Sequence, residues 1–268
     1  MESMDSLFAA LAEADQKGIA VALATVVAVS GSVPRHVGAK MLVYADGSTL
    51  GTVGGGEMEN RVCAEAADAL RERKPRTVHY ELSNPALGDP GQCGGTADIF
   101  IDPICPLVTL VVVGAGHVGR AVARLGKQLG FFVVVSDDRA ELCTPEALPG
   151  ADAYLVCAMR DIPSRWSLDR DTYVVLATRN VDVDVEGLPA LLAVPTAYVG
   201  VIGSRRRWIT TAQALAEHGT PAETIARVHS PIGLELHAET PEEIAVSILA
   251  EVIMVRRGGT GLSMSEPG

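Results

Sequence analysis

The stretch that decides the fold of this chain is Leu110-Val111-Val112-Val113-Gly114-Ala115-Gly116-His117-Val118-Gly119. A β-branched run leads into a G-x-G-x-x-G turn, and a helical pattern follows with His117 near its start. Gly114 permits the tight turn, Gly116 lets a pyrophosphate approach bare backbone, and Gly119 lets the helix pack close to the strand. The motif therefore predicts the first strand, turn and helix of a dinucleotide-binding sheet.

A second apolar strand is predicted at 131–135, and it is followed by Asp137 and Asp138. An acidic residue about 20 residues after the glycines is placed to hold the hydroxyls of a ribose. We therefore expect Asp137 to contact a nucleotide. The alternative is a domain that keeps the glycine turn and binds nothing.

The second half of the chain alternates predicted strands and helices, which indicates a parallel sheet covered on both faces. The strands are expected at 107–113, 131–135, 153–157, 173–177 and 197–202, and the helices between them at 118–129, 185–192 and 205–218. Ligands of such sheets bind beyond the carboxyl ends of the strands. The residues that we expect to line this edge are Gly114, Asp137, Arg160, Thr178, Arg179, Asn180, Ser204 and Arg205.

Two Thr-Pro-x-Glu segments, which begin at Thr220 and Thr240, predict helix N-termini capped by these threonines. Ser204 is a third expected cap, and Arg205-Arg206-Arg207 follows it. Cations in a first helical turn oppose the helix dipole, so these arginines indicate a bound anion. The alternative is that they bend away to carboxylates elsewhere.

The first part of the chain predicts a mixed α/β unit. Helices are expected at 6–16 and 57–71, and strands at 19–29, 40–44, 49–53, 77–82 and 97–101. We expect one domain at 1–104, a second at 105–257 and a flexible tail at 258–268.

Two glycine-rich segments of the first domain are candidates for binding. Gly54-Gly55-Gly56 follows a strand and opens a helix, so it is either a second anion cradle or a plain tight turn. Gly91-Gln92-Cys93-Gly94-Gly95 places a thiol between glycines, where a nearby cation would make it a reactive thiolate. Cys93 is therefore the candidate reactive thiol, whereas the other four cysteines lie in apolar segments.

Composition narrows the class of protein. The net charge is −11, from 22 Lys and Arg against 33 Asp and Glu, which argues against a nucleic-acid partner. The five cysteines have no C-x-x-C spacing, which is typical of a cytoplasmic protein without a structural zinc site or a disulfide framework. The apolar runs at 19–29 and 244–255 are shorter than the roughly 20 residues that a membrane span needs.

Taken together, these motifs resemble the XdhC/CoxI family of xanthine dehydrogenase accessory proteins. In the first domain the matching segments are Gly31-Ser32-Val33-Pro34-Arg35, Gly38-Ala39-Lys40-Met41, Gly54-Gly55-Gly56 with Glu59, and Gly91-Gln92-Cys93-Gly94-Gly95. In the second they are Gly114-Ala115-Gly116-His117-Val118-Gly119-Arg120, Asp137-Asp138-Arg139, Gly200-Val201-Ile202-Gly203-Ser204-Arg205-Arg206, Pro231-Ile232-Gly233-Leu234 and 238–245.

The resemblance implies an N-terminal XdhC/CoxI domain followed by a Rossmann-like, doubly wound parallel sheet. It implies a chaperone rather than a catalyst, which binds the molybdenum cofactor and delivers it in sulfurated form to a molybdenum hydroxylase of the xanthine or carbon monoxide dehydrogenase type. A cysteine desulfurase is an implied second partner. Many relatives carry a cysteine where this chain has Gly56, which leaves Cys93 as the matching thiol and the expected contact to molybdenum.

Two other functions are consistent with the same residues. The first is an NAD(P)-dependent oxidoreductase, in which Asp137 favours NAD. The second is a nucleotide-sensing module that regulates assembly of the client enzyme. For all three functions a homodimer is the default expectation. The expected cofactor contacts are Gly54, Gly55, Gly56, Cys93, Gly114, Gly116, His117, Gly119, Asp137, Thr178, Ser204 and Arg205.

Overall fold

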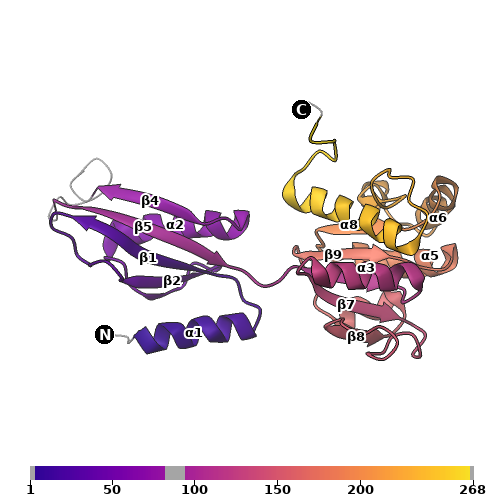
Figure 1. Ribbon diagram of the computed structural model, residues 1–268, viewed down its shortest axis with the longest axis horizontal. Coiled ribbons are helices and arrows are strands. Elements are labelled where there is room, and N and C mark those ends of the chain that lie inside the picture. Colours follow the sequence, from indigo (N-terminus) through magenta and orange to yellow (C-terminus); the bar gives the residue numbers. More distant parts are fainter. Residues whose placement is uncertain (1–3, 82–93, 266–268) are drawn as a thin grey trace. The chain divides into compact units, whose positions relative to one another are not determined.

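The structure is a computed structural model that describes residues 4–81 and 94–265. The chain forms two compact units that divide between Pro106 and Leu107 (Figure 1). We call them the N-terminal unit and the C-terminal unit, and each is described by itself.

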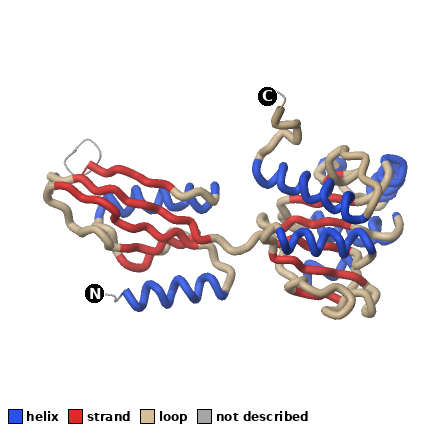
Figure 2. Tube along the Cα trace, viewed as in Figure 1, coloured by secondary structure: helices blue, strands red, loops and turns tan. Residues whose placement is uncertain are grey.

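The N-terminal unit contains an antiparallel sheet of five strands in the order β3-β2-β1-β5-β4 (Figures 1 and 2). The strands are β1 (Val21–Ser30), β2 (Lys40–Tyr44), β3 (Thr49–Gly51), β4 (Arg76–Glu81) and β5 (Thr96–Ile104). The helices are α1 (Met4–Gln16) and α2 (Gly56–Glu72).

Alternating side chains decide which helix covers which face of this sheet. Ala22 and Ala24 of β1 pack with Val62 and Ala66 of α2 in one cluster. Val21, on the opposite face of β1, packs with Leu7 and Ala14 of α1. Because successive side chains of a strand point to opposite faces, the apolar strand β1 is covered on both sides.

The C-terminal unit contains a parallel sheet of six strands in the order β11-β10-β9-β6-β7-β8. The strands are β6 (Thr109–Val113), β7 (Phe132–Asp137), β8 (Ala153–Val156), β9 (Thr172–Leu176), β10 (Tyr198–Val201) and β11 (Val228–His229). The helices are α3 (His117–Gln128), η2 (Met159–Asp161), α4 (Ile162–Arg165), α5 (Val181–Leu192), α6 (Arg205–Glu217), α7 (Ala222–Ile225) and α8 (Pro241–Arg257).

Helices cover both faces of the parallel sheet. Leu110 and Val112 of β6 pack with residues of α3 and α8, and Val111 and Val113 pack with residues of α5 and α6. The strands are therefore apolar on both faces, as expected for a sheet of this class. The predicted doubly wound parallel sheet and the mixed α/β unit before it are confirmed.

Several local predictions differ from the structure. The helix predicted at 185–192 begins at Val181, because the side chain of Asn180 accepts a hydrogen bond from the N–H of Val183. Thr240 caps α8 in a full capping box, as predicted. The cap predicted at Thr220 is wrong, because Pro221 occupies the N-cap of α7. Strand β11 was not expected, since two residues carry no periodicity.

Among the described residues, the structure contains no helix that combines the length and the apolar character needed to cross a bilayer.

The close contact of α3 with the glycine turn gives a test of the fold. A Cβ added at Gly119 would overlap the carbonyl oxygen of Gly114, whereas one added at Gly116 would meet open space. We expect Gly119→Ala to cost about 1–3 kcal/mol of unfolding free energy, because α3 must shift from the strand. Gly116→Ala is the matched control, which should retain wild-type stability.

Both tryptophans, Trp166 and Trp208, lie in the C-terminal unit, so tryptophan fluorescence during urea denaturation measures the unfolding of this unit. Equal midpoints for the two variants would contradict the prediction.

Candidate functional site

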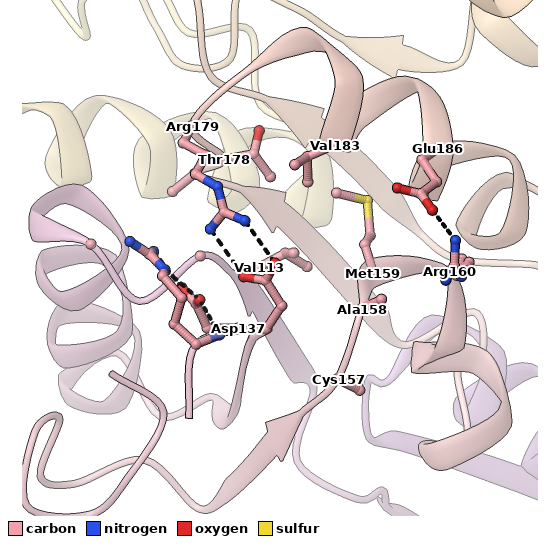
Figure 3. A pocket seen from close by; sticks show the side chains of 16 residues that line it. Val113, Asp137, Cys157, Ala158, Met159, Arg160, Thr178, Arg179, Val183 and Glu186 are labelled. Carbon is pink, nitrogen blue, oxygen red and sulfur yellow. Dashed lines mark hydrogen bonds and ion pairs between the residues drawn. The ribbon is translucent and has the colours of Figure 1, made fainter. Parts of the chain in front are cut away.

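The candidate site is a pocket at the carboxyl edge of the parallel sheet (Figure 3). The strand order reverses between β6 and β9. Strands β7 and β8 lie on one side of β6, whereas β9 and β10 lie on its other side. The loops that leave β6 and β9 diverge at such a point and open a crevice. A cavity of about 220 Å³ lies there, between the ends of β6, β7, β8 and β9 and the first turns of α5.

The glycine turn forms one wall of this pocket. Gly114 has a φ of +104°, and a Cβ at this position would lie 2.5 Å from the carbonyl oxygen of Ala177 in the loop after β9. Gly116 also lines the pocket, as the N-cap of α3. Gly119 packs against the turn from behind, and His117 is the exposed first residue of α3. Of these four residues, Gly114 and Gly116 line the pocket.

Asp137 ties the turn to the end of β7. Asp137 is buried, with 4% relative exposure. One carboxylate oxygen accepts the N–H of Ala115 at 2.7 Å and Nη2 of Arg139 at 2.8 Å. The other accepts the N–H of Arg139 at 3.0 Å and its Nε at 2.9 Å. These four bonds use about all the acceptor positions of a carboxylate.

The environment of Asp137 also sets its charge. Burial by itself would raise the pKa of this carboxyl, but the hydrogen bonds from Arg139 and from two backbone N–H groups lower it to about 2. The side chain is therefore ionised at neutral pH. The role of Asp137 towards a ribose stays a prediction, and its observed partners belong to the chain itself.

Charged side chains around the pocket pair with one another, as the dashed lines in Figure 3 show. Nη2 of Arg139 lies 2.8 Å from Asp137, and Arg179 makes two contacts of 3.0 and 2.6 Å to Asp138. The remaining pair is Arg160 of η2 with Glu186 of α5. The charged residues that line the pocket are thus three arginines and three acids, and their formal charges cancel.

One wall of the pocket is apolar. Cys157, Ala158 and Met159 follow β8, and they face Val183 and Gly187 of α5. A Cβ at Gly187 would lie 2.5 Å from Cβ and Sδ of Met159, so the glycine allows η2 to approach α5 this closely.

On the other side of the β9 end, the space is filled by Arg207 of α6. Its Nη2 donates to the buried carboxylate of Asp184 at 2.6 Å, to the hydroxyl of Thr178 at 2.9 Å and to the carbonyl of Asn180 at 3.1 Å. Its Nη1 donates to the carbonyl of Thr178 at 3.2 Å. Burial raises the pKa of Asp184, while the hydrogen bonds from Thr178 and Arg207 act in the opposite direction.

The arginines after Ser204 therefore separate in their roles. Arg207 turns to a carboxylate, which is the alternative considered for this triplet, whereas Arg205 and Arg206 are exposed. Ser204 caps α6 by accepting the N–H of Arg207 at 3.2 Å. Neither Ser204 nor Arg205 is among the residues that line the pocket.

In the N-terminal unit, the loop that starts α2 is closed by its own glutamate. The carboxylate of Glu59 accepts the N–H groups of Gly55 at 2.9 Å, Val53 at 3.2 Å and Gly54 at 3.4 Å, and the hydroxyl of Thr52 at 2.5 Å. Burial opposes ionisation of Glu59, but these donors lower its pKa below the usual value. An anion at Gly54–Gly56 would have to replace this carboxylate; binding there stays a prediction.

Three motif loops of this unit meet one another. A Cβ at Gly31 would lie 2.9 Å from Cα of Gly95, and a Cβ at Gly54 would lie 3.0 Å from the ring of Pro34. We call residues 31–35, 54–56 and 94–95 the loop cluster. The segment that contains Cys93 lies outside the described residues, and Cys93 directly precedes Gly94 in the sequence.

Sequence reasoning found part of the pocket and missed part of it. It expected Gly114, Asp137, Arg160, Thr178 and Arg179 at this edge, and all five line the pocket. It missed the wall that α5 provides, because the start of that helix was placed four residues too late. Cys157, which the sequence assigned to an apolar segment, is buried in a core cluster and also lines the pocket. No group of three or more potential metal ligands is present among the described residues.

Comparisons with known proteins agree with the two-unit organisation. A family model described as the XdhC Rossmann domain matches residues 110–252, and one described as the XdhC and CoxI family matches residues 14–81. The chain belongs to the XdhC and CoxI family. The first match covers the parallel sheet and its pocket, and the second covers α2 and most of the antiparallel sheet.

Relatives of this XdhC/CoxI family member include two Escherichia coli K12 proteins. The uncharacterized protein YqeB is 38% identical over 264 residues, which are 98% of this chain and 48% of YqeB, so this chain spans about half the length of that relative. The molybdenum cofactor insertion chaperone PaoD is 26% identical over 273 residues, which cover 91% of this chain and 86% of PaoD. A crystal structure of a xanthine dehydrogenase from Bacillus halodurans has a TM-score of 0.51 and 25% identity, and covers 99% and 98% of the two chains.

The lowered pKa of Asp137 predicts how stability depends on pH. A carboxyl whose pKa falls from 3.8 in the unfolded chain to about 2 in the folded one stabilises the fold above pH 4. This contribution is about 2 kcal/mol at pH 7, and it is lost as the pH falls towards 2. We expect Asp137→Asn to lower the unfolding free energy by about that amount at pH 7 and by little near pH 2. Tryptophan fluorescence in urea at several pH values measures this. A penalty that is constant over this range would contradict the assignment.

The contacts of Glu59 predict that its loss frees the loop before α2. In Glu59→Ala, the N–H groups of Val53 and Gly55 lose their acceptor, so their hydrogen exchange should become faster. Glu57→Ala is the control, because Glu57 is exposed on the same helical turn and accepts a hydrogen bond from the side chain of Asn60. Mass spectrometry of peptides from this loop measures the exchange. Equal rates in both variants would show that Glu59 does not hold the loop.

Proposed function

We propose that this XdhC/CoxI family member is an accessory protein that binds the molybdenum cofactor and inserts it into a molybdenum hydroxylase of the xanthine dehydrogenase type. The observation that carries the proposal is the likeness to PaoD, a molybdenum cofactor insertion chaperone, over 91% of this chain. The likeness extends through both units, so the proposal concerns the whole chain. The cofactor is cargo in this function, and the protein holds it without converting it.

The loop cluster of the N-terminal unit is the place that we propose for the molybdenum end of the cargo. Its glycines bring the backbone of residues 31–32 against that of residues 94–95. Cys93, which lies outside the described residues, directly precedes Gly94 in the sequence, and we propose its thiol as the contact to the cargo. A thiolate is a soft ligand, which suits molybdenum or a sulfur atom bound to it. Glu59 keeps the neighbouring loop in place through four hydrogen bonds.

Finer features of the proposal follow from the family resemblance. The cargo is delivered in sulfurated form, a cysteine desulfurase supplies the sulfur, and the client is a xanthine or carbon monoxide dehydrogenase. The protein acts in the cytoplasm, as a homodimer. A nucleic-acid partner and a membrane partner are not part of the proposal, since the net charge is −11 and the apolar runs are short.

The test is whether the purified full chain carries the cofactor and passes it on. We expect wild-type protein from a molybdenum-replete host to release molybdopterin on denaturation, and to activate an apo-hydroxylase. Cys93→Ala should lose most of both properties. Cys63→Ala is the matched control, because Cys63 lies partly buried on α2, where burial raises the pKa of its thiol.

The two measurements separate the possible failures. Wild-type protein without molybdopterin, together with no activation of the hydroxylase, would overturn the proposed function. Full activity of Cys93→Ala would retain the function but remove the thiol from it. Equal losses in Cys93→Ala and Cys63→Ala would indicate a general effect on the fold, which circular dichroism of both variants would reveal.

A further inference from the structure

We propose that the outer side of helix α8 is an interaction surface, and that its partner is α8 of a second copy of this chain, packed antiparallel to it. The inference deepens the proposed function and rests on it for the expectation of a homodimer, to which no surface has been assigned. Its basis is a line of exposed apolar side chains on α8 that ends in a negative charge on one side and a positive charge on the other.

Helix α8 lies beside α3 on one face of the parallel sheet, and its inner side is firmly held (Figure 1). Ile248 and Val252 are buried in the core cluster between this helix and the sheet. Glu251, on the same side, accepts hydrogen bonds from the hydroxyl of Tyr198 at 2.8 Å and from the N–H of Gly233 at 2.5 Å. Because these contacts fix the rotation of α8 about its axis, they also fix which residues face outwards.

The outward-facing residues form one line along the helix. We call them the α8 stripe, and they are Glu242, Val246, Ala250, Ile253 and Arg257. Steps of three or four residues keep these side chains on the same face of a helix. Val246 is 50% exposed and Ile253 is 37% exposed, and the two charged residues are exposed as well. An apolar line with charged ends is typical of a surface that packs against another protein.

The positions along the α8 stripe suit a twofold symmetric pair. Val246 and Ile253 lie equally far from the midpoint of the stripe, which is beside Ala250, and so do Glu242 and Arg257. If a twofold axis passes through this midpoint, Val246 of one copy meets Ile253 of the other, and Glu242 of one copy meets Arg257 of the other. The small side chain of Ala250 at the crossing point lets the two helices approach closely.

The charges of α8 decide the direction of pairing. Its first turn carries Glu242 and Glu243, and its last turn carries Arg256 and Arg257. A parallel pair of copies would bring like charges together, whereas an antiparallel pair brings opposite charges together. Within the described residues, neither Glu242 nor Arg257 forms an ion pair, so both can pair with the second copy. The helix dipole accounts for the sign of these charges but not for their place on the α8 stripe.

The size of the α8 stripe sets the expected strength of the contact. The helix has 17 residues and is therefore about 25 Å long. Two such helices form an interface at the small end of the range for protein complexes, so we expect a Kd of about 1 to 100 μM.

Sedimentation velocity of the full chain over a range of concentrations tests the apolar part of the contact. We expect Ile253→Glu to raise the Kd of the dimer at least about tenfold, because a charge would be buried between the helices without a partner. Ile209→Glu is the matched control, since Ile209 is 57% exposed on α6, which covers the opposite face of the sheet. This control should retain the wild-type Kd, and circular dichroism checks that both variants fold. Equal Kd values for the two variants would overturn the assignment of α8.

Charge reversal gives a sharper test, because it depends on the antiparallel direction. Glu242→Lys by itself, or Arg257→Glu by itself, brings like charges together at both ends of the pair, so each variant should raise the Kd about tenfold. In an equimolar mixture of the two variants, both ends of a mixed pair bring opposite charges together. Mixed dimers should therefore form with about the wild-type affinity, and a fluorescent label on one variant follows them during sedimentation. A mixture that dimerises no better than either variant by itself would overturn the antiparallel arrangement.

The outcomes for this surface and for the proposed function can be told apart. A full chain that releases molybdopterin but stays monomeric above about 100 μM would overturn this inference and leave cofactor binding intact. A chain that dimerises through the α8 stripe, but neither releases molybdopterin nor activates an apo-hydroxylase, would overturn the proposed function and support the interface.

Discussion

The hydrogen bond from the N–H of Ala115 to the carboxylate of Asp137 is the contact on which the C-terminal unit depends. Together with the bond from the N–H of Gly114 to the carbonyl of Ser136, it holds the turn after β6 against the end of β7. The position of this glycine turn also sets the distance between α3 and the sheet, because Gly119 packs directly on Gly114. Burying the charged carboxylate of Asp137 costs free energy unless its oxygens accept hydrogen bonds. Arg139 supplies the donors that the N–H of Ala115 does not.

The N-terminal unit also holds a glycine-rich loop in place with a carboxylate of its own chain. A strand runs into a glycine-rich loop that opens α2, and Glu59 from that helix accepts the loop's N–H groups. In both units a carboxylate of the chain takes donors that a glycine-rich helix start would otherwise offer to an anion. Glycines at such a turn therefore indicate close packing of the backbone, and they do not by themselves indicate anion binding. Anion binding depends on whether any donor remains, or on whether a charged pair nearby can open.

The charged side chains that line the pocket of the C-terminal unit balance one another. Three arginines and three acids surround it, and they differ in how firmly they are held. Asp137 is fixed by burial, whereas Asp138 and Arg179 remain half-exposed. Arg207 adds a further asymmetry, since it joins α6 to the loop after β9 and fills one side of the crevice. The C-terminal unit, which has the fold of a dinucleotide-binding domain, thus presents a small cavity lined by charged pairs and apolar side chains.

The sequence by itself determined the two-part α/β architecture, since the glycine turn, the apolar periodicity and the capping box at Thr240 are local signals. It also identified the strand ends that line the pocket, because carboxyl ends of parallel strands share one edge. Only the tertiary structure decided what the charged residues do. Glu251 broke an apolar run in the sequence, yet it accepts hydrogen bonds from Tyr198 and Gly233 and contacts His229. Arg207 and Asp137 likewise meet acceptors or donors that folding brings close, and such long-range pairings leave no periodic trace in a sequence.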